Sequence, residues 1–400
     1  MKSESTNHWP RTVWDTLTIV MFVALLWLPT VDYFFKIDPS PMPVENRRPA
    51  PWPQFGGIRQ SREFVTGIDR YFDDHFGFRK SLVRVNNHLK GYWFHDASAG
   101  RPVLIGKDGW LYYSGDAMLE NWTRESRFSE QDLENWRHLL ETRRDWLRAR
   151  GIKYIFVVPP DKHTVYPEHL PDWMKTSPEP SKIQQLTQYL RLHSNVEILD
   201  LSPALIQARN VRADYLETDT HWNLFGSFVG YETLLQALDR QMPGLKPLPQ
   251  GAYNWKLETR PAGDLAMLLG RTDSYTESNA VQAVPLAALP EVKVLYHPEG
   301  VPPADTLEHS PCYTLNAQAA GKAIVFRDSF AINWYPFLGQ NFGEVLYLWQ
   351  YDWNRPLIER ERPDVVIDEI TERFFNIENP VELEHEDELS QTRSASAKGN

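Results

Sequence analysis

A serine near the end of the chain, Ser329, occurs where a nucleophile could act. It follows an apolar run at 323–326 whose β-branched members are typical of a buried strand. The segment 331–340 is compatible with a helix, so Ser329 lies at an expected strand-to-helix turn. At such a turn the hydroxyl reaches the rim of the sheet, and the N–H groups of the helix start point toward the group under attack. The pattern predicts nucleophilic chemistry at Ser329.

A serine hydroxyl is a weak nucleophile until a base takes its proton. The segment 217–223 offers such a base, His221, and a carboxylate, Asp219, two residues before it. Residues i and i+2 of an extended segment project to the same side, so Asp219 could orient the imidazole of His221. We therefore expect Ser329, His221 and Asp219 to form a catalytic triad.

Each of these residues also has an ordinary explanation. Serine is a common helix N-cap, and a histidine beside an aspartate often lies in a solvated loop. A metal site is a further use of Asp219 and His221, for which His163, His169 or His193 could supply another ligand, but their spacing forms no tight metal motif. Spacing alone leaves these alternatives open. We expect neither a bound metal nor another cofactor.

Other residues close to these segments are candidates for contact with a substrate. Ligands of parallel sheets bind at the carboxyl ends of strands, so the loop after a strand at 154–158 could face the same crevice as Ser329. Arg327 and Asn333 lie close to Ser329 in the chain, and the direction of their side chains does not follow from the sequence. The candidates are Lys162, His163 and Tyr166 in that loop, Trp222 beside His221, and Arg327 and Asn333 beside Ser329.

Short apolar strands alternate with helices over much of the chain. Strands are expected at 154–158, 196–199, 323–326, 344–348 and 364–367, and helices at about 181–192, 224–240 and 354–361. A helix capped by Ser129 and a β-hairpin at 103–113 come before them. The alternation predicts an α/β fold in which helices cover both faces of a mostly parallel sheet.

Composition divides the chain into five parts. After a short tail, 1–12, the mostly apolar run at 13–35 predicts an uncleaved transmembrane anchor. The proline-rich stretch 36–60 would act as a spacer before a catalytic body at 61–376. Within that body, 250–310 is expected to be a long irregular insertion. The acidic segment 377–400 is expected to be disordered.

The overall composition restricts the possible classes of protein. A hydrophobic share of 42% allows a sizeable core, and the net charge of -11 makes nucleic acid an unsuitable partner, because phosphate binding needs a basic face. The single cysteine, Cys312, excludes an internal disulfide and a thiolate metal cluster.

Several blocks occur in the order found in one known family. They are PPDKHTVYPE at 159–168, DTHW at 219–222, AGDLAM at 262–267 and FRDSF at 326–330, with further matches at 106–112 and 363–369. Through these blocks, about residues 45 to 375 resemble the SGNH-hydrolase-like O-acetyltransferases of bacterial alginate and other exopolysaccharides (AlgJ/AlgX-like). Blocks in a fixed order are more specific than any one of them.

The resemblance implies a periplasmic enzyme, held in the inner membrane, that moves acetyl groups onto hydroxyls of a secreted polysaccharide. Ser329 would carry the acetyl group, His221 would act as general base and then acid, and Asp219 would orient His221. Some family members have a C-terminal carbohydrate-binding module, whereas an acidic segment follows residue 380 here, so the resemblance is to the membrane-anchored members without that module. The polymer need not be alginate. The resemblance also implies a multipass membrane acyltransferase as partner.

Two alternatives to the transferase are compatible with the same sequence. An acetyl esterase of this fold would differ only in using water as the acyl acceptor. A non-catalytic scaffold subunit of a polysaccharide acetylation complex would retain the fold without needing Ser329.

Overall fold

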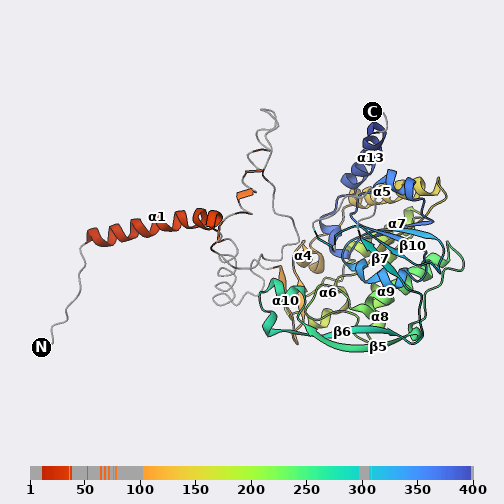
Figure 1. The fold of residues 1–400 in the computed structure, drawn as a ribbon, viewed down its shortest axis with the longest axis horizontal. Coiled ribbons are helices and arrows are strands. Elements are labelled where there is room, and N and C mark those ends of the chain that lie inside the picture. Colours follow the sequence, from red (N-terminus) through yellow and green to blue (C-terminus); the bar gives the residue numbers. More distant parts are fainter. Residues whose placement is uncertain are drawn as a thin grey trace. The chain divides into compact units, whose positions relative to one another are not determined.

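The structure, a computed structural model, divides into two compact units, Met1–Arg101 and Pro102–Asn400. It describes residues 11–35, scattered positions between 37 and 78, residues 102–296 and residues 306–397 apart from 308 (Figure 1). The predicted spacer and most of 61–101 lie outside these residues. The compact unit that carries the predicted triad begins at Pro102, whereas the sequence placed the start of the catalytic body at residue 61.

The second unit is built on a mixed sheet of seven strands in the order β4-β3-β11-β9-β10-β8-β7. Neighbouring strands from β4 to β10 pair in parallel, while β8 and β7 add to one edge in antiparallel orientation. The prediction of a mostly parallel sheet is therefore confirmed. The strands are β3 (Lys153–Val158), β4 (Ile198–Asp200), β7 (Lys293–Tyr296), β8 (Cys312–Leu315), β9 (Lys322–Arg327), β10 (Glu344–Trp349) and β11 (Val365–Glu369).

Helices cover both faces of this sheet, because successive strand residues project to opposite sides. Ile324 and Phe326 of β9 pack with α5 (Glu130–Arg148), α7 (Lys182–His193) and α12 (Arg355–Glu361). Ala323 and Val325 pack on the other side with α8 (Ser202–Ala208), α9 (Leu224–Asp239) and α11 (Tyr335–Leu338). The result is the predicted three-layer α/β/α arrangement.

The helix boundaries follow the capping signals of the sequence. Ser129 and Ser181 form capping boxes with Asp132 and Gln184, which fixes the starts of α5 and α7. The predicted hairpin is present as β1 (Val103–Ile105) and β2 (Leu111–Tyr113). The short helices are α4 (Met118–Thr123), α6 (Lys162–Val165), η2 (Pro167–His169), η3 (Gln250–Ala252), α10 (Asp264–Leu268), η4 (Thr272–Ser274), η5 (Phe330–Trp334) and η6 (Glu372–Asn376).

The insertion predicted to be irregular contains a regular ribbon, so that prediction is wrong. Strands β5 (Tyr253–Pro261) and β6 (Thr276–Pro285) pair in antiparallel orientation and run along one side of the second unit (Figure 1). Most side chains of β5 are at least partly exposed, so its sequence shows little hydrophobic alternation. The pairing of two exposed strands left no clear sequence signal.

The acidic segment predicted to be disordered also forms regular structure. Helix α13 (Pro380–Ala397) lies beside α5 (Figure 1). Its Leu383 and Asp387 are buried, and the Asp387 carboxylate accepts hydrogen bonds of 2.9 and 3.0 Å from the Arg143 guanidinium. The composition of this segment predicted that its acidic side chains would be solvated. Asp387 is instead buried with Arg143 as its partner.

The first unit contains one long apolar helix, α1 (Arg11–Phe35). Its stretch Trp14–Asp32, 19 residues with a mean hydropathy of 1.7, is long and apolar enough to cross a membrane. Apolar side chains such as Ile19, Phe22 and Trp27 are more than half exposed. Length and composition are therefore compatible with the predicted anchor.

Candidate active site

The structure brings the three predicted catalytic side chains into one hydrogen-bonded line. Ser329 Oγ lies 2.7 Å from Nε2 of His221, although 108 residues separate them in the chain. The other ring nitrogen, Nδ1, lies 2.7 Å from Oδ1 of Asp219. Both contacts are in hydrogen-bond range, and each imidazole nitrogen has its own partner. This is the geometry of a nucleophile, a base and an orienting carboxylate.

Ser329 is positioned by the turn between β9 and η5. It is half-buried, whereas its neighbours Asp328 and Phe330 are fully buried. Asp328 Oδ1 accepts the Phe330 N–H at 2.9 Å, and Oδ2 accepts the Thr371 N–H at 2.9 Å and the Tyr351 hydroxyl at 3.0 Å. Asp328 therefore fixes the turn and leaves the neighbouring hydroxyl accessible.

The loop that carries Asp219 and His221 is closed at its base. Tyr215 and Trp222 form an antiparallel bridge, and the Leu216 N–H donates to the His221 carbonyl at 3.2 Å. Buried Lys162 reaches the loop from α6 and donates to the carbonyls of residues 216, 217 and 219 at 2.9, 3.0 and 2.7 Å. Lys162, expected to contact substrate, instead holds the catalytic loop.

The ribbon segment, which consists of β5, β6 and the residues between them, also contacts the loop that carries Asp219 and His221. Glu277 of β6 accepts hydrogen bonds from the N–H groups of Glu217 and Thr218 at 3.1 and 2.9 Å, and from the Thr218 hydroxyl at 2.8 Å. A Cβ at Gly263 would lie 2.4 Å from Cβ of Asp219, so the close approach here requires glycine.

Asp264 contacts the candidate triad and was missed by the sequence argument. Its N–H donates to Asp219 Oδ2 at 3.0 Å, and its Oδ1 accepts the Thr220 N–H at 2.7 Å. Its Oδ2 lies 3.8 Å from His221 Nδ1. A signal was present, because Asp264 belongs to the block AGDLAM that supported the family resemblance.

The carboxylates set the charge state of the imidazole. Burial lowers the pKa of His221, but the hydrogen bond and charge of Asp219, helped by Asp264, more than offset it and raise the pKa above 6.5. Burial tends to raise the pKa of Asp219, yet its hydrogen bonds and the charge of His221 hold that pKa below its ordinary value. Burial and the charge of Asp219 raise the pKa of Asp264. An anionic Asp219 therefore faces the imidazole.

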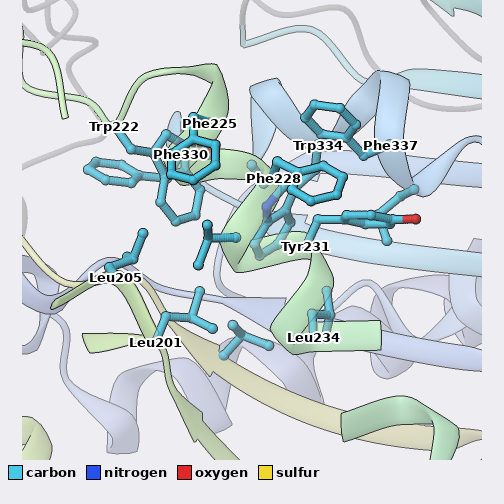
Figure 2. Packing of buried hydrophobic residues seen from close by; sticks show 14 of the residues in the cluster. Leu201, Leu205, Trp222, Phe225, Phe228, Tyr231, Leu234, Phe330, Trp334 and Phe337 are labelled. Atoms are coloured by element: carbon cyan, nitrogen blue, oxygen red, sulfur yellow. Dashed lines mark hydrogen bonds between the residues drawn. The ribbon is translucent and has the colours of Figure 1, made fainter. Parts of the chain in front are cut away.

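A buried aromatic cluster links the two catalytic segments. Trp222, which follows His221, donates its Nε1–H to the Phe330 carbonyl at 3.1 Å and packs on the Phe330 ring. Figure 2 shows these two rings together, with Trp334 close by and Phe228 of α9 among them. Trp222 and Trp334 are fully buried. The expectation that Trp222 contacts a substrate is wrong, because this side chain is buried and joins the His221 loop to the Ser329 turn.

The other predicted substrate contacts are not placed at the triad. Tyr166 is buried and donates to Asp214 Oδ1 at 2.8 Å. Arg327 is buried against the rings of Trp349 and Tyr335, and His163 is buried at a separate cluster. These positions correct the expectations for Tyr166, Arg327 and His163. Asn333 is half-buried in η5, and its role stays a prediction.

The structure also bears on the alternative that Asp219 and His221 bind a metal ion. The third possible ligand beside them is Asp264, not His163, His169 or His193. Because both nitrogens of His221 already contact Asp219 and Ser329, the observed arrangement matches a proton relay rather than a coordination sphere.

Comparisons with known proteins bear on the family and the fold. Residues 103–298 match the family model described as "SGNH hydrolase-like domain, acetyltransferase AlgX". This part of the chain is therefore similar to the SGNH hydrolase-like domain of AlgX-type acetyltransferases. The solved structure of Bacillus cereus PatB1 superposes with a TM-score of 0.52 at 16% identity, over 70% of this chain and 99% of that one, which shows a shared fold. The predicted fold and the family resemblance are confirmed.

Curated relatives match about half of this chain. The probable alginate O-acetylase AlgJ of Pseudomonas aeruginosa is 29% identical over 189 residues, which cover 47% of this chain and 44% of AlgJ. The protein of the same name from Pseudomonas syringae pv. tomato is 28% identical over 209 residues, covering 52% and 51%. The chain thus matches about half the length of these relatives.

Proposed function

We propose that this chain is an O-acetyltransferase that acylates hydroxyls of a secreted, alginate-like polysaccharide through Ser329. The observation that carries the proposal is the line from Ser329 Oγ through the His221 ring to Asp219, with 2.7 Å at each contact. The names of the AlgJ relatives, probable alginate O-acetylases, support the acetyl group and the class of polymer.

In the first half of the reaction Ser329 becomes acetylated. Nε2 of His221 takes the hydroxyl proton as Oγ attacks the acetyl carbonyl, and the Ser329 N–H can stabilise the oxyanion that forms. His221 then gives that proton to the leaving group as its bond to the acetyl carbon breaks. Asp219 accepts the Nδ1–H and stabilises the imidazolium formed between these two transfers.

In the second half a sugar hydroxyl takes the acetyl group. His221 removes the hydroxyl proton, the sugar oxygen attacks the acyl-serine carbonyl, and the bond to Oγ breaks. The proton returns from His221 to Oγ, so the triad regains its starting state. No external reductant, oxidant or metal is required by this sequence of steps.

An esterase is the second candidate, because water could take the place of the sugar hydroxyl. The His221 side chain is 24% exposed and Ser329 is half-buried, so the triad is open to solvent. The two functions differ only in which acceptor reacts faster with the acyl-serine.

Incubating the purified chain with an acetyl ester and an alginate oligosaccharide separates these candidates. We expect acetylated oligosaccharide to form and an acetyl group to be trapped on the peptide that contains Ser329 when the acceptor is omitted. Release of acetate with no acetylated sugar, at any acceptor concentration, would instead identify an esterase.

We further propose that α1 holds the protein in the inner membrane with the catalytic unit in the periplasm. The apolar stretch Trp14–Asp32 supports an anchor. Acetyl groups must be supplied on the periplasmic side, which fits a multipass membrane acyltransferase as the partner that delivers them.

A further inference from the structure

A second group of possible metal ligands lies buried outside the triad. It consists of Asp161, His163 and Glu372, whose ligand atoms are all within 4.8 Å of one another. Their residues are only 5%, 2% and 1% exposed. Asp161 and His163 follow β3, and Glu372 follows β11; these two strands are parallel neighbours in the sheet. The group therefore joins two adjacent strand ends at the carboxyl edge.

Each member of this group has one polar atom without a partner among the described residues. These atoms are Asp161 Oδ2, His163 Nε2 and Glu372 Oε1. A buried polar atom without a hydrogen bond is costly, so three of them on three neighbouring ligand side chains need a physical explanation.

The remaining oxygen atoms of the two carboxylates are already occupied. Asp161 Oδ1 accepts from Arg373 at 2.6 Å. Glu372 Oε2 accepts the Asp161 N–H at 3.0 Å and the Thr164 hydroxyl at 2.7 Å. These bonds fix both carboxylates and leave their second oxygen atoms available to one additional group.

We propose that Asp161 Oδ2, His163 Nε2 and Glu372 Oε1 bind one divalent transition-metal ion of the zinc class. One imidazole and two carboxylates suit zinc or manganese better than calcium or magnesium, which favour oxygen ligands throughout. Metal–ligand bonds of about 2.0–2.2 Å in a tetrahedral site place the ligand atoms about 3.3–3.6 Å apart, so the three side chains would have to draw together from the 4.8 Å limit within which one ligand atom of each now lies. Water would fill the open positions.

The charges around the group are compatible with an added cation. The guanidinium groups of Arg373 and Arg124 act on His163, but Asp328 acts on Asp161, and Asp200 acts on Glu372. A divalent ion at this group would therefore lie among carboxyl groups as well as guanidinium groups.

The bound ion would act as a brace beside the catalytic turn and would take no part in acyl transfer. Arg373 connects the two regions, because it pairs with Asp161 and its guanidinium lies 5.3 Å from the ring centroid of Phe330. Losing the ion should therefore lower thermal stability even when no substrate is present.

The test uses the untagged full chain in detergent, loaded with zinc chloride alone and then passed through gel filtration. Glu372→Gln and His163→Gln remove ligands with little change of volume. His169→Gln is the matched control, because His169 stacks on Trp110 and lies outside the group. Zinc content, zinc affinity and the thermal midpoint are measured for each protein.

We expect the wild type and His169→Gln to retain about one zinc ion per chain and to melt at a higher temperature with zinc. The two ligand variants should bind zinc about tenfold more weakly or worse. X-ray absorption of the zinc-loaded wild type should show one imidazole among oxygen ligands, a result that does not depend on either variant folding.

Two results would overturn the proposal. The first is a wild-type chain that retains no zinc above a chelator-treated control. The second is zinc held equally well by Glu372→Gln and His163→Gln, which would indicate another site, such as Asp219, His221 and Asp264.

Discussion

A second carboxylate, that of Asp264, lies near the triad on the side of the His221 imidazole away from Ser329. Asp219 makes the hydrogen bond to His221 Nδ1, while Asp264 lies farther away at 3.8 Å and holds the backbone of the loop at Thr220. Asp219 can therefore orient the ring, and Asp264 adds negative charge without competing for the same hydrogen bond. In the proposed acyl transfer both charges would stabilise the imidazolium that forms.

Replacing Ser329 with alanine tests whether the hydroxyl is the nucleophile. We expect acetyl transfer to fall by several orders of magnitude, because the triad members act as a unit. Ser274→Ala is the control, since Ser274 is exposed and lies in η4 outside the triad. Polymer acetylation in cells is measured alongside transfer in vitro. Undiminished acetylation with Ser329→Ala would favour the non-catalytic scaffold.

The charge of Asp264 should affect how the reaction rate depends on pH. His221 must be neutral to act as base, so the rate should rise with pH through its pKa, which lies above 6.5. Asp264→Asn removes one charge that raises this pKa, so the midpoint of the rise should move to lower pH. The measurement is the pH profile of kcat/KM, with Asp273→Asn, an exposed carboxylate, as control. An unchanged midpoint in Asp264→Asn would contradict this role.

The sequence could predict the triad but not its surroundings. Ser329 and the pair Asp219–His221 stood at recognisable positions, a strand end and an i, i+2 spacing. Lys162 and Trp222 have the polar or aromatic side chains common in binding sites, yet one holds loop carbonyls and the other is buried. Which way a side chain points depends on packing between distant segments, and a local pattern does not record that.

At the scale of elements, the catalytic loop depends on the ribbon segment that looked irregular in the sequence. Gly263 shows this most directly. Its φ of -79° is ordinary for any residue, so a substitution there acts through the added atom and not through backbone strain. That atom would lie 2.6 Å from Asp219 Oδ2.

Gly263→Ala should therefore displace the Asp219 carboxylate and lower kcat by about tenfold or more, since small misplacements of catalytic groups are costly. Gly251→Ala is the matched control, because a Cβ at Gly251 would meet no atom within 4 Å. Kinetics and thermal unfolding are measured for both variants. Equal kinetics in the two would show that Asp219 tolerates the added methyl group.

The buried ion pair between Asp387 of α13 and Arg143 should contribute to the stability of the fold. Asp387 is fully buried and pairs with Arg143, which also contacts Asp368. Removing one charge of such a group leaves another unbalanced, which typically costs about 3–5 kcal/mol. Asp387→Asn should lower the free energy of unfolding by an amount of this order, measured by denaturant titration. Glu386→Gln, an exposed neighbour on the same helix, should have little effect.

The elements that the sequence predicted well bury many apolar side chains. The central strands are continuous apolar runs because helices cover both faces of the sheet, and the capped helices α5 and α7 show helical periodicity because they bury one face. Strand β5 and helix α13 expose much of their surface. Strand β5 depends on its pairing with β6, and α13 depends on Arg143, which lies far away in the chain. Their stability comes from pairing and a buried ion pair, which neither periodicity nor composition reveals.

At the scale of the whole molecule, the proposed function needs both a soluble catalytic unit and a link to the membrane. The catalytic unit has its own sheet, core and triad within Pro102–Asn400. The apolar helix lies in the other unit, so catalysis and membrane attachment can be tested separately.

Deleting residues 1–35 should release the protein from membranes while leaving the triad intact. The full chain should stay with membranes through a carbonate wash, because a 19-residue apolar helix is about the length needed to span the hydrocarbon core. The shortened chain should be soluble and still react with a soluble acetyl ester, because the triad lies wholly in the other unit. Polymer acetylation in cells should nevertheless fall, since acetyl groups delivered at the membrane would no longer reach Ser329 efficiently.

Full-length Ser329→Ala is the control for attachment without chemistry. Extraction of the full chain by carbonate would contradict a spanning helix, and full polymer acetylation by the shortened chain would contradict delivery at the membrane.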